Sequence, residues 1–323
     1  MIGEPTANRN GPVVVVGAHV QGLFLDVHSV PREGETVLAS SFDEPLDGGK
    51  STNQAVAAAR LGAPTALVTV VGTDERGDRA LAYFASEGID VTGCSRVDGA
   101  TDVGVVLLPP SGIPAIVTVL DRNRELDAAC VRQAAEIVRS GSVVVCALEA
   151  PQEAAVAAFE LAREAGAYTI LNPAPAAELA SELLALTDVL VPNEHEAAAV
   201  AGRKGSPADL ARFLAQKLPV RVVVVTAGPQ GALVAGEDGT VEQLAAPAVE
   251  AVDTTGAGDA FIGAFASGLQ QGWSTVDAAA FGVKAASTSV TRPGTMPSFP
   301  TADELMETRN AETASSRGTE NAG

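Results

Sequence analysis

The sequence predicts an α/β fold in which helices cover both faces of a central, mostly parallel sheet. The apolar runs are short and rich in valine, as at residues 13–16 and 222–225, which is typical of strands buried on both faces. From residue 126 onward, strand patterns alternate with helical patterns long enough to cross back over a sheet. The chain has 323 residues and is 46% hydrophobic, which is enough apolar surface for one large domain.

The first part of the chain mixes elements of this sheet with further extended segments. Residues 12–17 predict the first central strand, and residues 66–71 predict a second. Helices are predicted over residues 51–61 and 74–87, with a turn at residues 88–90. The remaining extended segments are apolar and β-branched, and we expect them to form a small sheet, a lid, outside the main one. These segments are residues 18–28, 36–42, 101–108 and 113–120, the last two joined as a hairpin.

The rest of the chain alternates regularly between the two kinds of element. The predicted helices are residues 126–140, 152–165, 176–186, a helix from Glu194, 207–217, 257–271 and 275–290. The predicted strands are residues 142–148, 168–171, 189–191, 221–226 and the hairpin 232–244. Residues 1–11 predict a flexible arm, and residues 305–323, rich in Glu, Thr, Ser, Asn and Gly, predict a disordered tail.

Composition excludes several classes of function. The chain carries 40 acidic and 21 basic residues, a net charge of −19, which argues against nucleic acids and anionic membranes as partners. It has no apolar run long enough to span a bilayer and no charged-then-apolar start, so we expect a cytoplasmic protein. Cys94, Cys130 and Cys146 lack metal-ligand spacing and predict neither a zinc site nor a disulfide framework.

The run DTTGAGD at residues 253–259 places two acids around small residues, just before apolar residues at helical spacing. The backbone N–H groups of Gly256, Ala257 and Gly258, at the N-terminus of that helix, would form an anion hole for a phosphate. Asp259 would stay ionised there and could take a proton from a hydroxyl that attacks the phosphate. Taken alone, a short glycine motif is more often an ordinary helix start.

Three further polar segments follow predicted strands, at the edge where α/β sheets bind ligands. Residues 172–175 read NPAP, which by itself also suits a proline-rich connection. Asn193 and Glu196 open a helix and would project to one face, which suits either a water-held Mg²⁺ or a capping box. Residues 226–231 read TAGPQG, a strand end followed by a glycine turn.

The DTTGAGD run and the run GGKSTNQA at residues 48–55 together resemble the two signatures of the ribokinase family, the PfkB-type carbohydrate kinases. The resemblance covers residues 12–304, which are therefore expected to form a kinase domain of ribokinase-like three-layer fold with a lid. It implies ATP-dependent phosphorylation of a primary hydroxyl of a small sugar, with ribose the leading candidate. It also implies Mg²⁺ and a monovalent cation, K⁺, as cofactors, and a homodimer formed through the lid.

The resemblance also assigns residues to each role. Catalysis falls to Asp259 with the amides of Gly256, Ala257 and Gly258. The substrate would contact Gly48, Gly49, Lys50, Asn53, Glu149 and Asp259. ATP would contact Asn193, Thr226, Gly228, Gly231 and Gly258. Mg²⁺ would lie near Asn193 and Glu196, held through water or phosphate. K⁺ would be held by Asp253 and the carbonyl of Thr255, completed by Ser289, Arg292, Gly294 and Ser298.

One departure from the family concerns the sugar. The family carries Asn-x-Asp after the glycine of the first strand, and that Asp clamps two sugar hydroxyls. Alignment without gaps puts Val20 and Gly22 at these positions, so discrimination for the vicinal diol of ribose should weaken by roughly a few kcal/mol. His19, Gln21 and Asp26 are the nearby polar side chains that could substitute.

The departure leaves two alternatives open. The first is a kinase on the same scaffold for a nucleoside, a modified sugar or a cyclitol. The second is a non-catalytic sugar-binding protein, against which the intact Asp259 motif stands.

Overall fold

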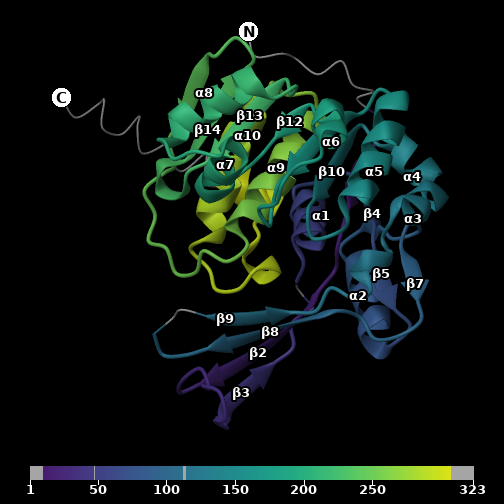
Figure 1. Cartoon of the computed structure of the whole chain (residues 1–323), viewed down its shortest axis with the longest axis vertical. Helices are drawn as coiled ribbons and strands as arrows, with labels where there is room; N and C mark the ends of the chain where they lie inside the picture. Colours follow the sequence, from purple (N-terminus) through teal and green to yellow (C-terminus); the bar gives the residue numbers. More distant parts are fainter. Residues whose placement is uncertain (1–9, 47, 112–113, 307–323) are drawn as a thin grey trace.

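The computed structural model describes residues 10–46, 48–111 and 114–306 (Figure 1). The arm predicted over residues 1–11 and the tail predicted over residues 305–323 lie almost wholly outside these described residues. In the part of the chain that is described, no helix combines the length and the apolar character that crossing a membrane would require.

A nine-stranded sheet in the order β15-β14-β13-β12-β11-β10-β1-β4-β6 forms the centre of the molecule. It is parallel from β6 to β13, and the hairpin of β14 and β15 adds an antiparallel edge. The strands are β1 (Val13–Val16), β4 (Thr65–Val68), β6 (Ile89–Asp90), β10 (Val143–Ala147), β11 (Tyr168–Asn172), β12 (Val189–Leu190), β13 (Val222–Thr226), β14 (Ala232–Gly236) and β15 (Val241–Leu244).

Helices cover both faces of this sheet and enclose two apolar cores. Along β1, Val14 and Val16 point into one core and Val13 and Val15 into the other, because successive side chains of a strand alternate between faces. The first core packs under α3 (Ala128–Gln133), α4 (Ala135–Ser140), α5 (Gln152–Glu164), α6 (Ser181–Leu186), α7 (Glu194–Ala201) and α8 (Pro207–Lys217). The second packs under α1 (Lys50–Arg60), α2 (Glu75–Ser86), α9 (Ala257–Gln270) and α10 (Thr275–Ser289). The predicted three-layer α/β fold is therefore confirmed.

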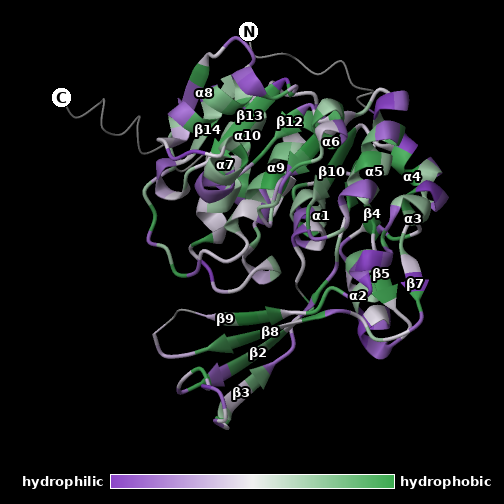
Figure 2. Cartoon of the chain, in the orientation of Figure 1, coloured by the Kyte–Doolittle hydropathy of each residue, from purple (hydrophilic) through white to green (hydrophobic). Residues whose placement is uncertain are grey.

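A second sheet forms the lid, in the order β3-β2-β8-β9, and projects from one end of the helical layers (Figure 1). Its strands are β2 (Gln21–Val27), β3 (Ala39–Asp43), β8 (Val103–Leu108) and β9 (Ala115–Thr118). Figure 2 shows β8 and β9 as hydrophobic strands. Phe42, Ile116 and Val117 are 60%, 59% and 68% exposed, so the lid presents apolar side chains to solvent.

Several predicted boundaries are wrong in the first part of the chain. The lid strand predicted over residues 36–42 begins only at Ala39. The strand predicted over residues 66–71 is divided, because β5 (Val70–Gly72) leaves the main sheet to pair with β7 (Ser95–Val97). Residues 88–90, predicted as a turn, include the short edge strand β6. These errors concern short pairings between distant segments, which no local pattern encodes.

Two predicted helices are shorter than expected. The helix predicted over residues 126–140 is divided at Ala134 into α3 and α4, after a 3₁₀ turn at Asn123–Glu125. The helix predicted over residues 176–186 begins only at Ser181. There the side chain of Gln152 accepts from the Ala180 amide and donates to the Glu178 carbonyl, so it pairs with backbone groups before the helix.

Candidate active site

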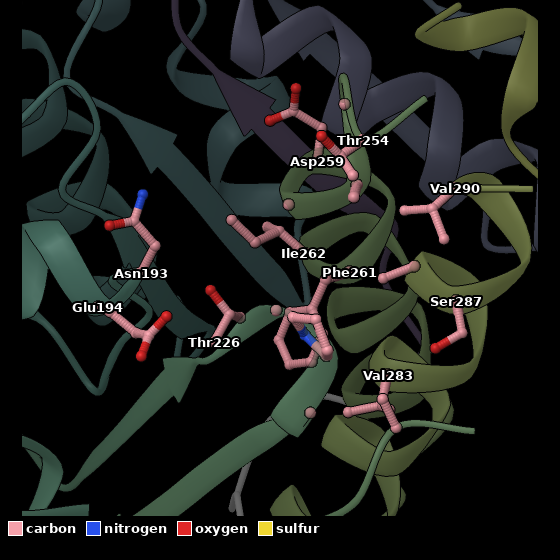
Figure 3. A pocket seen from close by; sticks show the side chains of 18 of the residues that line it. Asn193, Glu194, Thr226, Thr254, Asp259, Phe261, Ile262, Val283, Ser287 and Val290 are labelled. Atoms are coloured by element: carbon pink, nitrogen blue, oxygen red, sulfur yellow. The ribbon is translucent and has the colours of Figure 1, made fainter. Parts of the chain in front are cut away.

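A cavity of about 840 Å³ opens at the carboxyl ends of the parallel strands, between α7 on one side and α9 and α10 on the other (Figure 3). Asn193 and Glu194 line the first side, and Phe261, Ile262 and Val283 line the second. Lys50 and Asp259 also line it. The cavity thus combines an apolar wall with a charged end, which suits a ligand that has both an apolar ring and charged groups.

The N-terminus of α9 borders this cavity. Gly256 precedes the helix with φ 76°, a left-handed conformation, and a Cβ there would lie 2.5 Å from Cγ2 of Thr295. The amide of Ala257 donates to the Thr254 carbonyl at 3.3 Å. The amides of Gly256, Gly258 and Asp259 have no hydrogen-bond partner among the described residues. These three donors are therefore open to an anion; within the predicted group of Gly256, Ala257 and Gly258, the Ala257 amide is the one already engaged.

Asp259 lies in the first turn of α9 and is only 6% exposed. Its Oδ2 accepts from Nδ2 of Asn53 at 2.9 Å, and its Oδ1 accepts from Nε2 of Gln54 at 3.0 Å. Burial raises the pKa of Asp259, while the Lys50 charge and the two amide hydrogen bonds lower it. The arrangement gives a carboxylate of fixed orientation beside open backbone amides.

Lys50 and Glu149 lie next to this carboxylate. The backbone amide of Lys50 donates to Glu149 at 2.5 Å, which joins the start of α1 to the segment after β10. Asp259, with smaller effects from Glu149 and Glu196, raises the pKa of the Lys50 ammonium group. Burial raises the pKa of Glu149 to about 7, against the opposing effect of its bond to the Lys50 amide. Glu149 therefore titrates near neutral pH.

Gly48 and Gly49 allow two backbone segments to pack together at the start of α1. Their φ values are 145° and 80°. A Cβ on Gly48 would overlap the carbonyl oxygen of Val20, and one on Gly49 would lie 2.7 Å from the carbonyl oxygen of Ala18. The glycines thus let α1, which carries Asn53, pack against residues 18–20, just before β2 of the lid.

Val20 and Gly22, the positions aligned with the family's Asn-x-Asp, are buried and carry no polar side chain. Gly22 pairs with Gly104 of β8, and a Cβ on Gly104 would lie 3.4 Å from Cγ1 of Val20. The three nearby polar side chains are engaged or buried elsewhere. The Gln21 amide donates to the Pro45 carbonyl, and Asp26 accepts from the Ser41 hydroxyl at 2.5 Å.

The His19 ring is buried at the start of the lid. Burial lowers the pKa of His19 to about 4, so the ring is neutral at physiological pH. Its Nδ1 lies 3.5 Å from the Thr52 hydroxyl, and the His19 and Phe84 rings make a T-shaped contact. These contacts favour a packing role for His19.

Asn193 and Glu196 form a capping box at the start of α7. Glu196 accepts from the amide and the side chain of Asn193 at 2.9 Å each, and Asn193 accepts from the Glu196 amide at 2.8 Å. A β-bridge joins Asn193 to Thr226, so two of the predicted ATP residues are adjacent. Gly228 and Gly231 follow with φ 49° and 88° in the turn after β13.

The residues predicted for K⁺ lie just before α9 and from the end of α10 onward. Asp253 accepts from the amide and hydroxyl of Thr255 at 2.9 and 2.7 Å, and from the Gly294 amide at 2.9 Å. The Ser289 and Ser298 hydroxyls lie 2.7 Å apart. The Arg292 guanidinium pairs with Glu304 at 2.9 Å. Because a guanidinium is cationic and has no acceptor, only the backbone carbonyl of Arg292 could ligate a cation. No cluster of three or more His, Cys, Asp or Glu side chains suited to a metal occurs in the described ranges.

Sequence reasoning gave no role to Gln54, and named Asn172 only as part of the NPAP run. The side-chain oxygen Oδ1 of Asn172 accepts from Nε2 of Gln54 at 3.2 Å. Adjacent helical residues point about 100° apart, so the pattern alone would not predict that Asn53 and Gln54 both reach Asp259. The sequence also did not reveal that α10 lines the cavity, because its apolar residues have the spacing of ordinary core residues.

Comparison with known proteins places this geometry in a family. Residues 12–302 match the profile described as "pfkB family carbohydrate kinase". A ribokinase of Staphylococcus aureus is 35% identical over 301 residues, covering 91% of this chain and 98% of that protein. A deoxyribokinase of Salmonella typhimurium is 33% identical over 302 residues, covering 91% and 97%.

Solved structures agree with these relatives. The structure of Arabidopsis thaliana ribokinase complexed with ribose and ATP has a TM-score of 0.86 and 30% identity, covering 92% of this chain and 98% of that chain. Ribokinase from Thermotoga maritima has a TM-score of 0.84 and 31% identity over 92% and 98%. The chain therefore belongs to the pfkB family of carbohydrate kinases.

Proposed function

We propose that ribose, or a sugar closely related to it, is the substrate of this ATP-dependent sugar kinase. The observation that carries the proposal is the position of Asp259, fixed by Asn53 of the upstream motif and bordered by the open amides of α9. The ribokinase relatives and the ribose-bound and ATP-bound structure of the plant enzyme support the choice of sugar and donor. The test is ADP release with ribose and ATP, with identification of the phosphorylated carbon.

The proposed reaction uses Asp259 as the base. Asp259 takes the proton of the attacking primary hydroxyl, and the amides of Gly258 and Asp259 stabilise the charge on the phosphoryl group. The Lys50 ammonium group adds a positive charge at the same place. Asn53, Glu149 and the Gly48-Gly49 turn would bind the sugar hydroxyls.

The apolar end of the cavity would hold the adenine of ATP. Val283 of α10 and Val290, just after that helix, line the apolar side, and Thr226 lies on the opposite wall. Gly228 also lines the cavity. The phosphates would then run along Asn193 towards the N-terminus of α9. A cavity of about 840 Å³ is large enough for a nucleotide.

The donor set fits hydrated Mg²⁺ near Asn193 and Glu196. Their oxygens each accept a hydrogen bond within the capping box, which leaves a second lone pair for a water molecule bound to the ion. When bound, Mg²⁺ would neutralise charge on the ATP phosphates. The carboxylate, carbonyl and hydroxyl oxygens around Asp253 suit K⁺, and the backbone there continues directly into α9.

The lid supports a proposed homodimer. Within the described residues, β3 and β9 form the open edges of its sheet, and both carry exposed apolar side chains, including Phe42 and Val117. Pairing of two lids would bury this surface. Sedimentation of the native protein and of Val117→Glu tests the assembly, and a monomeric native protein rejects it.

We also propose a cytoplasmic location, where ATP is available.

A second candidate substrate is a sugar that lacks one hydroxyl, such as deoxyribose. Val20 and Gly22 supply no carboxylate at the positions where the family's Asp clamps two sugar hydroxyls. The deoxyribokinase relative supports the same choice. A panel of ribose, deoxyribose, a nucleoside and a cyclitol, compared by kcat/KM, decides between the candidates. Preference for the nucleoside or cyclitol would overturn both.

A further inference from the structure

We infer that Gln54 is a positioning residue for Asp259, holding the oxygen of the base that Asn53 does not contact. This inference rests on the proposed function, in which Asp259 accepts the proton of the sugar hydroxyl. It adds a residue that contacts neither substrate nor ATP in that scheme.

A chain of side-chain amides connects Asp259 to the main sheet. Gln54 uses Nε2 for both of its bonds, to Oδ1 of Asp259 at 3.0 Å and to Oδ1 of Asn172 at 3.2 Å. Nδ2 of Asn172 donates to the Val191 carbonyl at 2.9 Å. Gln54 is 1% exposed and Asn172 6%, so water competes little with these bonds.

The chemistry of the chain fixes the orientation of each amide. The Val191 carbonyl can only accept, so the Nδ2 end of Asn172 must face it and the oxygen end must face Gln54. Gln54 then lies between two acceptors, the oxygen of Asn172 and the carboxylate of Asp259. A flipped Gln54 amide would place three oxygens together, so Nε2 is held towards Asp259.

Gly263 allows α1 and α9 to come close enough for this contact. It lies one turn after Asp259, and a Cβ on it would be 2.5 Å from Cβ of Ala57 and 2.7 Å from the carbonyl oxygen of Gln54. Any side chain there would push the helices apart. The crossing therefore sets the reach of Gln54 to the carboxylate.

The two amides that contact Asp259 have different surroundings. Oδ1 of Asn53 and Oε1 of Gln54 are both buried and have no partner in the described part of the chain. The Nδ2 group of Asn53 contacts Asp259 alone, so the Asn53 amide is available to a sugar hydroxyl. Nε2 of Gln54, in contrast, is also bound to Oδ1 of Asn172. Asn53 can thus change partners when the sugar enters, while Gln54 keeps the plane of the carboxylate fixed.

The charged groups around Asp259 are Lys50 from α1, Glu149 after β10 and Glu196 from α7. Burial raises the pKa of Asp259, and the Gln54 hydrogen bond is one of the effects that lower it. Removing that bond should make the base easier to protonate.

The experiment measures the pH dependence of kcat/KM in Gln54→Met, which keeps the length of the side chain and removes its donors. We expect kcat to fall by about tenfold or more, ADP affinity to stay unchanged, and the acidic limb that belongs to Asp259 to rise by about one to two pH units. Because Glu149 titrates near neutral pH, the shift is also measured in a Glu149→Gln background. An unmoved acidic limb would overturn the inference, because a purely structural loss lowers activity without changing that pKa.

Matched variants separate the possible failures. Gln270→Met removes a half-buried donor at the other end of α9 and should leave the profile unchanged. If Gln54→Met does not fold, Gln54→Asn takes its place, because that side chain stays polar but is too short to reach Asp259. In an Asp259→Asn background, Gln54→Met should cost little more activity, and a full additive loss counts against the inference. If Asp259→Asn itself keeps normal turnover, the proposed function fails instead.

Discussion

Nδ2 of Asn53 donates to Oδ2 of Asp259 at 2.9 Å, across 206 residues of sequence. The bond joins the two glycine-rich motifs of the chain into one site. The glycines of each motif place the helix that follows. Gly49 lets α1 begin close to the backbone of Ala18, and Gly256 lets α9 begin with its amides open. The proposed sugar and phosphate sides of the site therefore both depend on the crossing of α1 and α9.

Replacing Asp259 by Asn should lower turnover by about 10² to 10⁴, because the base is lost while the shape of the side chain is kept. ADP binding should persist, since the amides of α9 remain. Steady-state ADP release and calorimetric titration check the two parts. Asp238→Asn, on an exposed turn, is the control and should be fully active. Near-normal turnover of Asp259→Asn would refute the assignment of the base.

Gly256→Ala should destabilise the protein and abolish activity together. A left-handed residue with a Cβ costs about 1–2 kcal/mol, and here the Cβ would also collide with Thr295. Gly202→Ala is the matched control, because Gly202 has φ 62° at the end of α7 and a Cβ there meets no atom within 4 Å. It should lose stability through strain alone and keep its kcat. If the two variants had the same melting temperature and the same kcat, the predicted collision of the added Cβ with Thr295 would be wrong.

The pattern of the sequence predicted the layers well because strand and helix periods are local properties. Val13 to Val16 alternate between the two cores whatever lies elsewhere in the chain. The contact of Gln54 with Asp259 is not local, because it depends on the approach of α9 to α1 at Gly263. The division of the helix at Ala134 and the departure of β5 from the main sheet likewise depend on distant partners. The motifs therefore identified candidate site residues such as Asp259, but the contacts those residues make in the fold could not be predicted from the sequence.

Glu149 should make the stability of the protein depend on pH. Burial raises the pKa of Glu149 from 4.5 in the unfolded chain to about 7 in the folded one. The folded state therefore holds more protons between these values, so the Glu149 contribution to stability is complete below about pH 4.5 and is lost as the pH rises to about 7. This loss is about 2–3 kcal/mol of unfolding free energy between pH 5 and pH 8, and Glu149→Gln should remove it. Urea unfolding at pH 5 and pH 8 should show a smaller fall for the variant than for the native protein, and parallel falls would disprove the shift.

Restoring an acceptor in the lid should sharpen the choice of sugar. Gly22→Asp with Val20→Asn introduces the carboxylate and amide that the family carries at these positions. The ratio of kcat/KM for ribose over deoxyribose should rise by about tenfold or more, because a site built to bind a hydroxyl rejects a sugar that lacks it. Gly22→Asn with Val20→Asn is the control for shape without charge. If the ratio stays constant in a folded double variant, this part of the lid does not contact the sugar.

Asp253 should connect activity to the monovalent cation. Its carboxylate accepts from Thr255 and from Gly294, so it ties the loop before α9 to the loop after α10. A cation bound to these oxygens would hold Gly256 and the open amides in place, and K⁺ should therefore raise kcat in the native protein. Asp253→Asn should lose most of that stimulation. Glu304→Gln, which weakens the neighbouring pair with Arg292 without removing an oxygen of the proposed site, should keep it. Assays in K⁺, Na⁺ and a bulky organic cation decide the point, since equal rates in all three would leave the site around Asp253 as a purely structural junction.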